Sequence, residues 1–458
     1  MESYDLVVVG SGPAGEKGAV QAAYFGKRVV VIERGPLGGA SVNTGTLPSK
    51  TLRETALVLS GFTQRGFRAA EMHVDTALTL DDFLHRERFV IGHERARIEQ
   101  NLTRHGVDVL TGEASFIDPH TLRVVAADGS EQQVRAAVVL LAPGSRPHRP
   151  TGIPFDDPRV FDSDEIVDLQ AMPDSLVVVG GGVIGCEYAC LFAALGVAVT
   201  LVEPKSRLLS FLDTEMSLAL TAAMVEDLGI DVLLGCSVGG ADLVDGGVVV
   251  HTSDGGAVQA NAALFASGRT GNTDRLELAN AGLAATARGH LEVDEHYRTA
   301  QPHIYAVGDV VGFPALAATS MEQGRIAVVH AFDLQYKTAL APVLPFGIYT
   351  IPEVSMAGAT EDELVAGGVP YVAGRAYYTG NARGTIVGDQ RGMAKLLFSA
   401  PDMRLLGVHV LGEQATELVH VGLTALLMGA TADLFIQTCF NHPTLSEVYK
   451  YATYDALG

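Results

Sequence analysis

Two glycine-rich turns have the residue types and the spacing that hold the pyrophosphate of a dinucleotide. Their glycines are Gly10, Gly12 and Gly15 in the first turn, and Gly180, Gly182 and Gly185 in the second. In such a turn the first glycine permits a tight bend, the second admits the phosphates to the backbone, and the third lets helix and strand pack closely. The N-terminus of the following helix then faces the negative charge. The two turns predict that the chain binds two dinucleotides.

An acidic residue ends the apolar run that follows each turn. Glu33 and Glu203 stand where a carboxylate is expected to accept hydrogen bonds from a ribose. Glu203 would bind the 2′-hydroxyl of NAD and repel a 2′-phosphate, whereas Lys205 and Arg207 could neutralise that phosphate. The second site therefore either accepts both NAD(H) and NADP(H), or its two cations are ordinary loop residues and the site prefers NAD(H).

Apolar runs rich in β-branched residues predict the buried parallel strands that must position these turns. The runs cover residues 6–9, 29–32, 138–141, 176–179, 197–202 and 304–307. Shorter alternating runs around residues 128–129 and 254–256 predict antiparallel hairpins. Since each glycine-rich turn lies between a strand and an alanine-rich stretch, we predict an α/β fold that uses one β-α-β plan twice.

A different pattern begins near residue 342. Strands are predicted by alternating runs at residues 345–354, 371–378, 393–398 and 405–411. Residues 416–428 then predict a helix. This order of elements predicts an α+β terminal domain with an antiparallel sheet.

Composition and charge exclude several classes of protein. The 458 residues suffice for about three domains, and the net charge of -21 argues against nucleic acid and anionic membrane surfaces as partners. No leader pattern opens the chain and no apolar run reaches the ~20 residues of a spanning helix, so we expect a cytoplasmic protein. The four cysteines form no C-x-x-C pair and no cluster with histidine, so neither a metal site nor a disulfide framework is expected.

Further segments carry a resemblance to a known family. Residues 38–50, 142–147, 266–269 and 306–309 resemble, in order, the signatures of the pyridine nucleotide-disulfide oxidoreductases. The resemblance implies that FAD binds at the first glycine-rich turn and NAD(P)H at the second. It also assigns Asp309 to the ribityl chain of the flavin, and Gly144 and Gly268 to the cofactor-binding signatures.

The same resemblance implies the domain organisation. Two Rossmann-like dinucleotide-binding domains are expected: an FAD-binding domain from residues 1–150 and 270–340, and an NAD(P)-binding domain from residues 151–269. A C-terminal dimerisation domain would cover residues 341–458. The chain is accordingly expected to form a homodimer or a higher homo-oligomer.

The family's redox-active cysteine pair is missing from the segment 38–50. Ser41 and Thr46 stand where the two cysteines would be, and a hydroxyl cannot take electrons from a reduced flavin. Both side chains are expected beside the flavin, where their hydroxyls either contact it or simply fill the volume of the missing cysteines. Within the family the chain most closely resembles the soluble, Si-specific pyridine nucleotide transhydrogenases, through residues 45–53, 182–189, 207–213, 269–273 and 349–353. Those enzymes usually keep a cysteine at the position of Ser41.

Two pairs of charged residues receive catalytic roles from the resemblance. Lys50 is expected near flavin N5, paired with Glu187, because a cation there favours the electron-rich reduced flavin. His442 and Glu447 resemble the acid/base dyad that serves the thiols of the disulfide reductases. Without a dithiol, this dyad is either retained structure at a dimer interface or a group that protonates or orients a substrate such as a quinone.

Three functions are compatible with these residues. The first is an NAD(P)⁺ transhydrogenase that moves hydride between NADPH and NAD⁺ through FAD, by a ping-pong mechanism. The second is an NAD(P)H-dependent quinone or dye reductase or oxidase, which also needs no cysteines. The third, a flavoprotein without catalysis or a binding component of a dehydrogenase, is disfavoured by the intact Lys50, Glu187 and glycine-rich turns.

Overall fold

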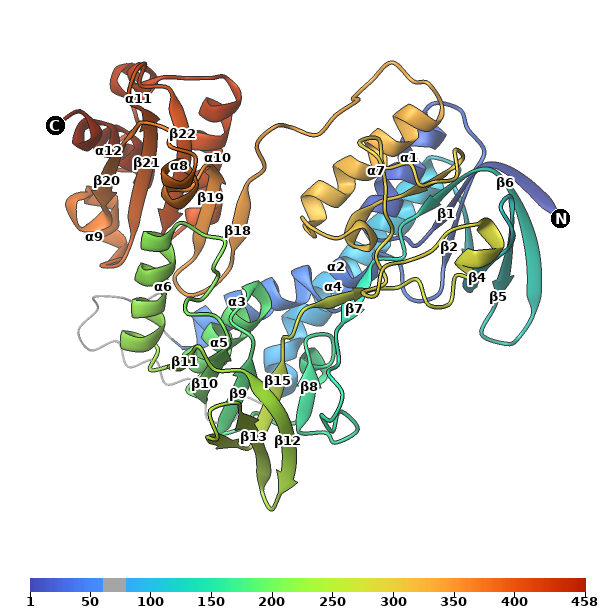
Figure 1. Cartoon of the computed structure of the whole chain (residues 1–458), viewed down its shortest axis with the longest axis horizontal. Helices are drawn as coiled ribbons and strands as arrows, with labels where there is room; N and C mark the ends of the chain where they lie inside the picture. The colour runs from blue at the N-terminus through green and yellow to red at the C-terminus, as the bar shows by residue number, and fades with distance from the viewer. Residues whose placement is uncertain (61–79) are drawn as a thin grey trace.

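The computed structural model describes residues 1–60 and 80–458, and five sheets organise this part of the chain (Figure 1). The first sheet is mostly parallel at its centre and has an antiparallel ribbon on one side. Its strands, in spatial order, are β3 (Asp108–Thr111), β2 (Val29–Glu33), β1 (Glu2–Val9), β6 (Glu131–Leu141), β5 (Thr121–Val125) and β4 (Glu113–Asp118), with β17 (Ile304–Ala306) on β6. The strands predicted at residues 6–9, 29–32, 138–141 and 304–307, and the hairpin around residues 128–129, are confirmed in this sheet. Those predicted at residues 176–179 and 197–202 are confirmed in the second sheet.

The second sheet is entirely parallel. Its strands, in spatial order, are β11 (Asp231–Leu234), β10 (Ala198–Glu203), β9 (Ser175–Val179), β15 (Ala262–Phe265) and β8 (Val160–Asp162). The predicted hairpin around residues 254–256 joins two strands of a separate antiparallel sheet, which consists of β12 (Val238–Val244), β13 (Gly247–Thr252) and β14 (Ala257–Ala260). Between the two parallel sheets runs a short antiparallel ribbon of β7 (Ser145–Pro147) and β16 (Arg269–Gly271).

The C-terminal sheet is antiparallel, as predicted. Its strands, in spatial order, are β18 (Phe346–Ile348), β19 (Val354–Gly358), β22 (Leu405–Leu411), β21 (Met393–Ser399) and β20 (Tyr371–Tyr377). The single strand predicted for residues 345–354 is wrong, since β18 and β19 are separate strands that pair with each other. Pro352 lies between them, and a proline has no N–H for a continuous ladder.

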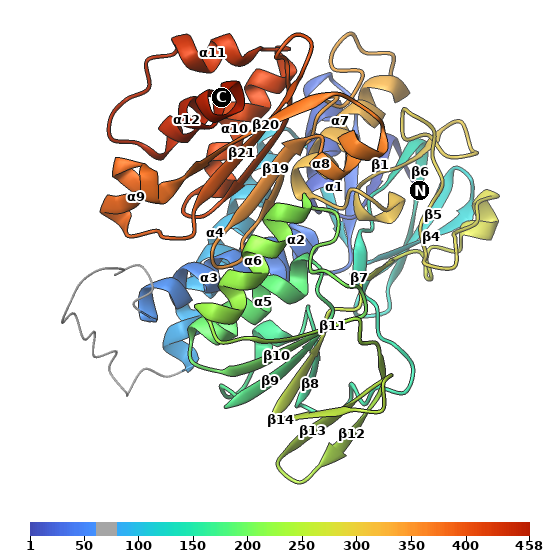
Figure 2. The same cartoon turned by 60° about the vertical axis from the view of Figure 1, so that its left-hand side comes forward.

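Helices cover these sheets, and Figures 1 and 2 show the C-terminal helices gathered on their own sheet. The helices are α1 (Pro13–Tyr24), α2 (Gly39–Asn43), α3 (Thr46–Leu59), α4 (Leu80–Arg104), α5 (Val183–Ala194), α6 (Thr214–Glu226), α7 (Ala317–Ala331), α8 (Glu361–Ala366), α9 (Ala382–Val387), α10 (Ala415–Leu427), α11 (Ala432–Gln437) and α12 (Val448–Leu457). The helix predicted at residues 416–428 is α10. Among the described residues, no helix combines the length and apolar character that crossing a bilayer requires.

One hydrophobic core ties α3 to the second sheet. Leu52 and Ala56 of α3 are buried in the same cluster as Cys186 and Cys190 of α5. Burial of a side chain as large as that of Leu52 contributes roughly 1.5–3 kcal/mol to stability. The shared core therefore holds the two helices together. This contact matters for function because Lys50 lies on α3 and Glu187 lies on α5.

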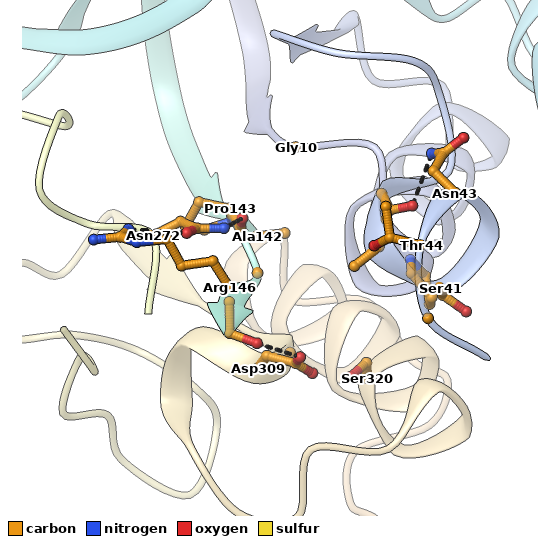
Figure 3. A pocket seen from close by; sticks show the side chains of 18 of the residues that line it. Gly10, Ser41, Asn43, Thr44, Ala142, Pro143, Arg146, Asn272, Asp309 and Ser320 are labelled. Atoms are coloured by element: carbon orange, nitrogen blue, oxygen red, sulfur yellow. Dashed lines mark hydrogen bonds between the residues drawn. The ribbon is translucent and has the colours of Figure 1, made fainter. Parts of the chain in front are cut away.

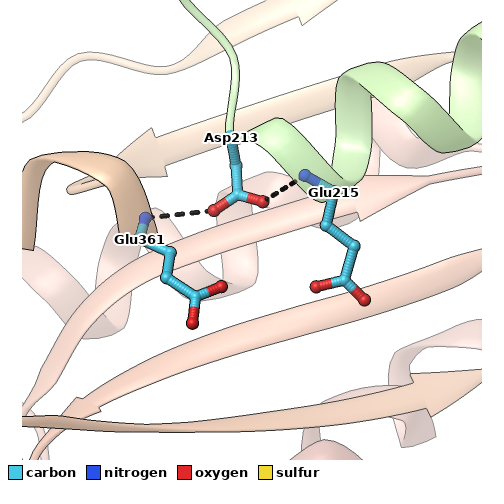
Figure 4. Close-up of side chains that lie close together, drawn as sticks. All are labelled: Asp213, Glu215 and Glu361. Carbon is cyan, nitrogen blue, oxygen red and sulfur yellow. Dashed lines mark hydrogen bonds between the residues drawn. The ribbon is translucent and has the colours of Figure 1, made fainter. Parts of the chain in front are cut away.

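A buried cluster of charges joins the second sheet to the C-terminal sheet, and Figure 4 shows its three carboxylates. Asp213, at the start of α6, accepts hydrogen bonds from the backbone N–H groups of Glu215 and Glu361. The three carboxylates lie close enough to share a cation. The ammonium of Lys395, on β21, supplies that charge: its Nζ lies 2.9 Å from Asp213 and 3.0 Å from Glu215, and it also pairs with Glu361. Arg375, on β20, adds a second cation 2.8 Å from Glu215 and 3.9 Å from Glu361. The Lys395 cluster is therefore an ion-pair network between α6 and the C-terminal sheet.

Candidate functional site

The first glycine-rich turn is shaped by close backbone contacts. Gly10 has φ +98°, and a Cβ there would lie 2.2 Å from the carbonyl oxygen of Ala142. A Cβ on Gly15 would lie 1.9 Å from the oxygen of Gly10. Only glycine fits such positions. The turn therefore delivers the N-terminus of α1 to the carboxyl ends of β1 and β6, where the ligands of such sheets bind.

Glu33 is fixed at the edge of this turn. One carboxylate oxygen accepts hydrogen bonds from the backbone N–H and the hydroxyl of Ser11, at 2.8 and 2.7 Å, and the other accepts from the N–H of Gly35. Ser11 Oγ in turn accepts from the N–H of Gly38. Ser11 thus connects the turn to the segment that carries Ser41, a link that the sequence pattern did not indicate.

The second turn repeats this arrangement. Gly180 has φ +113°, and a Cβ on Gly185 would lie 1.8 Å from the oxygen of Gly180. Glu203 is buried and accepts hydrogen bonds from the backbone N–H groups of Gly181 and Lys205. The carboxylate thus stands beside the turn, as Glu33 does in the first site. The two sites are built on the same plan, as their sequences predict.

A cavity of about 600 Å³ opens along the first turn (Figure 3). It brings together most of the residues that sequence reasoning assigned to the flavin, namely Gly10, Gly12, Glu33, Ser41, Thr46, Lys50, Gly144 and Asp309. Val183, Ile184 and Glu187 of α5 line it as well. The cavity therefore extends from the first glycine-rich turn to the first residues of α5.

Charged and polar groups converge on the far end of this cavity. Lys50 Nζ lies 2.5 Å from Glu187 Oε2, and the Glu187 side chain is only 8% exposed. The other oxygen of Glu187 accepts a hydrogen bond from the backbone N–H of Tyr349, at 2.9 Å. Lys50 Nζ also lies 5.0 Å from the centroid of the Tyr349 ring, which is a cation–π contact. Sequence reasoning missed Tyr349, because nothing in the spacing of residues 50 and 349 predicts that they meet.

A second polar chain runs along the wall of the cavity. Arg269 Nε donates to Ser145 Oγ at 2.7 Å, and Ser145 Oγ donates to Asp309 at 2.7 Å (Figure 3 shows the second bond). Arg269 also lies 3.4 Å from Asp164. Burial raises the pKa of Asp164, and the neighbouring Arg269 opposes this shift. Ser145, Asp164 and Arg269 were not among the predicted site residues.

These residues fit a bound flavin nucleotide. The turn at Gly10 offers backbone N–H groups for the phosphates, and Asp309 offers a carboxylate for hydroxyl groups. The hydroxyl of Tyr188, which is 4% exposed and lines the cavity, has no hydrogen-bond partner among the described residues. Buried polar atoms rarely remain without partners, so this hydroxyl is free to bond a ligand or a trapped water.

Other predicted residues lie outside the cavity. Lys205 is exposed, and its Nζ donates to Ser210 Oγ at 2.9 Å. Arg207 turns its guanidinium to Thr214, to the carbonyl oxygen of Ser210 and towards Asp362. Because these groups already engage Arg207, Lys205 is the freer of the two cations, and a 2′-phosphate role for either residue stays a prediction.

The histidine dyad faces outward on the C-terminal part of the chain. His442 Nδ1 lies 3.1 Å from both carboxylate oxygens of Glu447, and the His442 side chain is 67% exposed. Burial opposes ionisation of Glu447, but the contact with His442 outweighs it and lowers the pKa of Glu447. Neither residue lines the cavity, and neither does Gly268.

Replacing Asp309 should weaken flavin retention. Asp309→Ala removes a carboxylate that can accept hydrogen bonds from a polyhydroxyl chain, so we expect FAD to bind about 10- to 100-fold more weakly. The measurement is the Kd of FAD from reconstitution of the apoprotein. Asp128→Ala, in an exposed hairpin turn, is the matched control. Equal FAD affinity in the two variants would contradict the assignment of Asp309.

Comparisons with known proteins agree with this geometry. Residues 4–324 match the pyridine nucleotide-disulphide oxidoreductase family, and residues 344–453 match its dimerisation domain. The chain is 47% identical over 460 residues to the soluble pyridine nucleotide transhydrogenase of Mycobacterium tuberculosis, and 42% identical over 461 residues to that of Pseudomonas fluorescens. Each alignment covers 100% of this chain and 98% of the relative.

Solved structures show the same fold. The HOCl-induced flavoprotein disulfide reductase RclA of Escherichia coli matches with a TM-score of 0.88 and 26% identity, over 98% of this chain and 99% of that one. LpdA of Mycobacterium tuberculosis matches with a TM-score of 0.90 and 28% identity, over 99% of each chain. The resemblance and the fold class predicted from the sequence are thereby confirmed. This chain belongs to the pyridine nucleotide-disulphide oxidoreductase family.

Proposed function

We propose that the protein is an FAD-dependent NAD(P)⁺ transhydrogenase, which moves hydride from NADPH to NAD⁺ by a ping-pong mechanism without a redox disulfide. The relatives named soluble pyridine nucleotide transhydrogenase, which align over the whole chain, support this activity. Its confinement to the cytoplasm, the Si-face specificity and the domain boundaries stay predictions from the sequence.

The observation that carries the proposal is the composition of the cavity around Lys50. The Lys50–Glu187 pair is in place, while Ser41 and Thr46 present hydroxyls. None of the four cysteines, all within the described residues, lines this cavity; Cys186, Cys190 and Cys236 are buried elsewhere and Cys439 is exposed. The site thus offers no sulfur to accept electrons, and a dissociable acceptor must collect them.

The residues of this chain contribute binding, orientation and charge. When bound, FAD supplies a ring that accepts and returns a hydride. Lys50 places a positive charge at the end of the cavity where negative charge develops, and Glu187 with Tyr349 holds its ammonium in position. Val183 and Ile184 offer apolar surface for a nicotinamide ring beside this charge. No general acid or base is required, since the reaction transfers only a hydride between the nucleotide and the flavin.

A double-mixing stopped-flow experiment tests the activity. The FAD-loaded enzyme is reduced anaerobically with NADPH, and is then mixed with NAD⁺ or with benzoquinone. We expect NAD⁺ to reoxidise the enzyme within the catalytic turnover time. Slow reoxidation by NAD⁺ beside fast reoxidation by benzoquinone would instead identify a quinone reductase, the alternative function predicted from the sequence.

Lys205 should govern the preference for the 2′-phosphate. Lys205→Ala removes an exposed ammonium from the loop beyond Glu203, so we expect NADPH to bind about 10- to 100-fold more weakly. NADH, which lacks the phosphate, should keep its affinity and serves as the internal control. Affinities follow from the dependence of the flavin reduction rate on nucleotide concentration. Equal losses for both nucleotides would show that Lys205 does not contact the phosphate.

A further inference from the structure

Two phenylalanine rings from distant parts of the chain each contact a third, Phe346. The rings of Phe313 and Phe346 are stacked, with centroids 6.0 Å apart and planes 14° apart. Phe211 joins them, with its centroid 5.8 Å from that of Phe346 and a tilt of 52°. We call Phe211, Phe313 and Phe346 the aromatic shelf.

The shelf lies at the rim of the cavity. Phe313 precedes the cavity-lining residues Ala315 and Leu316, and Phe346 directly precedes Gly347, which also lines the cavity. Phe211 follows Glu203 in the loop between β10 and α6. None of the three rings lines the cavity itself, but Phe313 and Phe346 lie within two residues of positions that do.

Much of the shelf faces solvent. Phe313 is 81% exposed and Phe211 is 38% exposed. A single exposed phenylalanine needs no explanation, but neighbouring exposed rings form an apolar patch of the kind that marks a binding surface. Because chain neighbours of Phe313 and Phe346 line the cavity, a ligand that extends out of the cavity is the occupant that we assign to the patch.

We propose that the shelf packs against the part of the nicotinamide nucleotide that NAD(H) and NADP(H) share. The proposal rests on the function proposed above, because a transhydrogenase must admit both nucleotides to one site. Glu203 and Lys205 favour opposite groups at the 2′-position and cannot serve both substrates equally. An uncharged aromatic surface binds the common rings without regard to the 2′-group, and such ring contacts are favourable beyond their buried area.

The reductive half-reaction tests this proposal with one nucleotide at a time. We expect Phe313→Ala to raise the Kd of NADH and of NADPH by the same factor, about 3- to 10-fold. Phe346→Ala should act in the same direction. Phe313→Tyr keeps the ring and should restore both affinities. Phe89→Ala, at a 65% exposed ring on α4 that stacks on His93, is the matched control. The flavin absorbance spectrum should be unchanged in all four variants.

Several results would overturn the proposal. Unchanged Kd values in Phe313→Ala would remove the nucleotide as the occupant, and a loss confined to NADPH would place the shelf at the 2′-phosphate. A shift from dimer to monomer by light scattering, with unchanged affinities, would assign the shelf to a second copy of the chain. A loss confined to benzoquinone reduction would assign it to that acceptor. These readouts do not require NAD⁺ to reoxidise the enzyme, so they stand apart from the test of transhydrogenation.

Discussion

Lys50→Met should slow flavin reduction by NADPH about 100- to 1,000-fold, the usual loss when a preorganised charge is removed from a developing anion. The substitution keeps the length of the side chain and removes its ammonium. Glu187, 8% exposed, then remains as an uncompensated negative charge at the end of the cavity. An unpaired buried charge disfavours further negative charge beside it, so the reduction potential of the flavin should also fall.

Two measurements separate this effect from damage to the fold. Anaerobic stopped-flow absorbance gives the rate of reduction, and equilibrium titration against redox dyes gives the potential. Lys50→Arg, which keeps the positive charge, is the matched control and should retain most of the potential while losing part of the rate. A Lys50→Met enzyme with the wild-type rate and potential would show that the ammonium acts only as structure.

Ser41→Cys combined with Thr46→Cys should return a redox-active disulfide to the cavity. Both residues line the same cavity, with Ser41 half-buried on α2 and Thr46 exposed at the start of α3, so the new side chains need little space. We expect the double variant to take up an extra pair of electrons in anaerobic titration. We also expect a long-wavelength absorbance, because a thiolate beside an oxidised flavin donates charge to it.

The single variants Ser41→Cys and Thr46→Cys are the controls, since neither can form a disulfide within the loop. Transhydrogenation by the double variant should decrease as electrons are diverted to sulfur. If the double variant takes up no more electrons than the wild type, the position of residues 41 and 46 relative to the flavin has been misassigned.

Local sequence patterns predicted much of this fold. The run 176–179 is continuously apolar because β9 is buried on both faces. The glycine-rich turn could be recognised because it follows this run directly. The separation of β18 from β19 was not predicted, because residues 345–354 alternate as one strand would. Pro352 marks the break in the sequence, but the chain reversal that places Tyr349 against Glu187 is a tertiary contact and leaves no period in the sequence.

In the candidate site, too, local patterns predicted the continuous segments but not the contacts between distant residues. Gly10 and Glu33 could be assigned from spacing, since strand, turn, helix and acid lie in one continuous segment. The contact between Lys50 and Glu187 was expected only from resemblance, and the shelf at Phe313 was not expected at all. Rings and charges that meet across domains depend on how the domains pack, which the local pattern of residues does not encode.

The Lys395 cluster makes the joint between the second and C-terminal sheets sensitive to acid. Burial opposes ionisation of both carboxyls, but other contacts outweigh it: His409 and then Lys395 lower the pKa of Asp213, and Lys395 with Tyr371 lowers the pKa of Glu361. Their stabilisation is complete above the pKa values of the unfolded chain, and is lost as the pH falls through the lower values of the folded state. Added salt has little access to an ammonium that is 1% exposed. Acid therefore weakens this joint by protonating its carboxyls, whereas added salt leaves the buried part of the network largely unscreened.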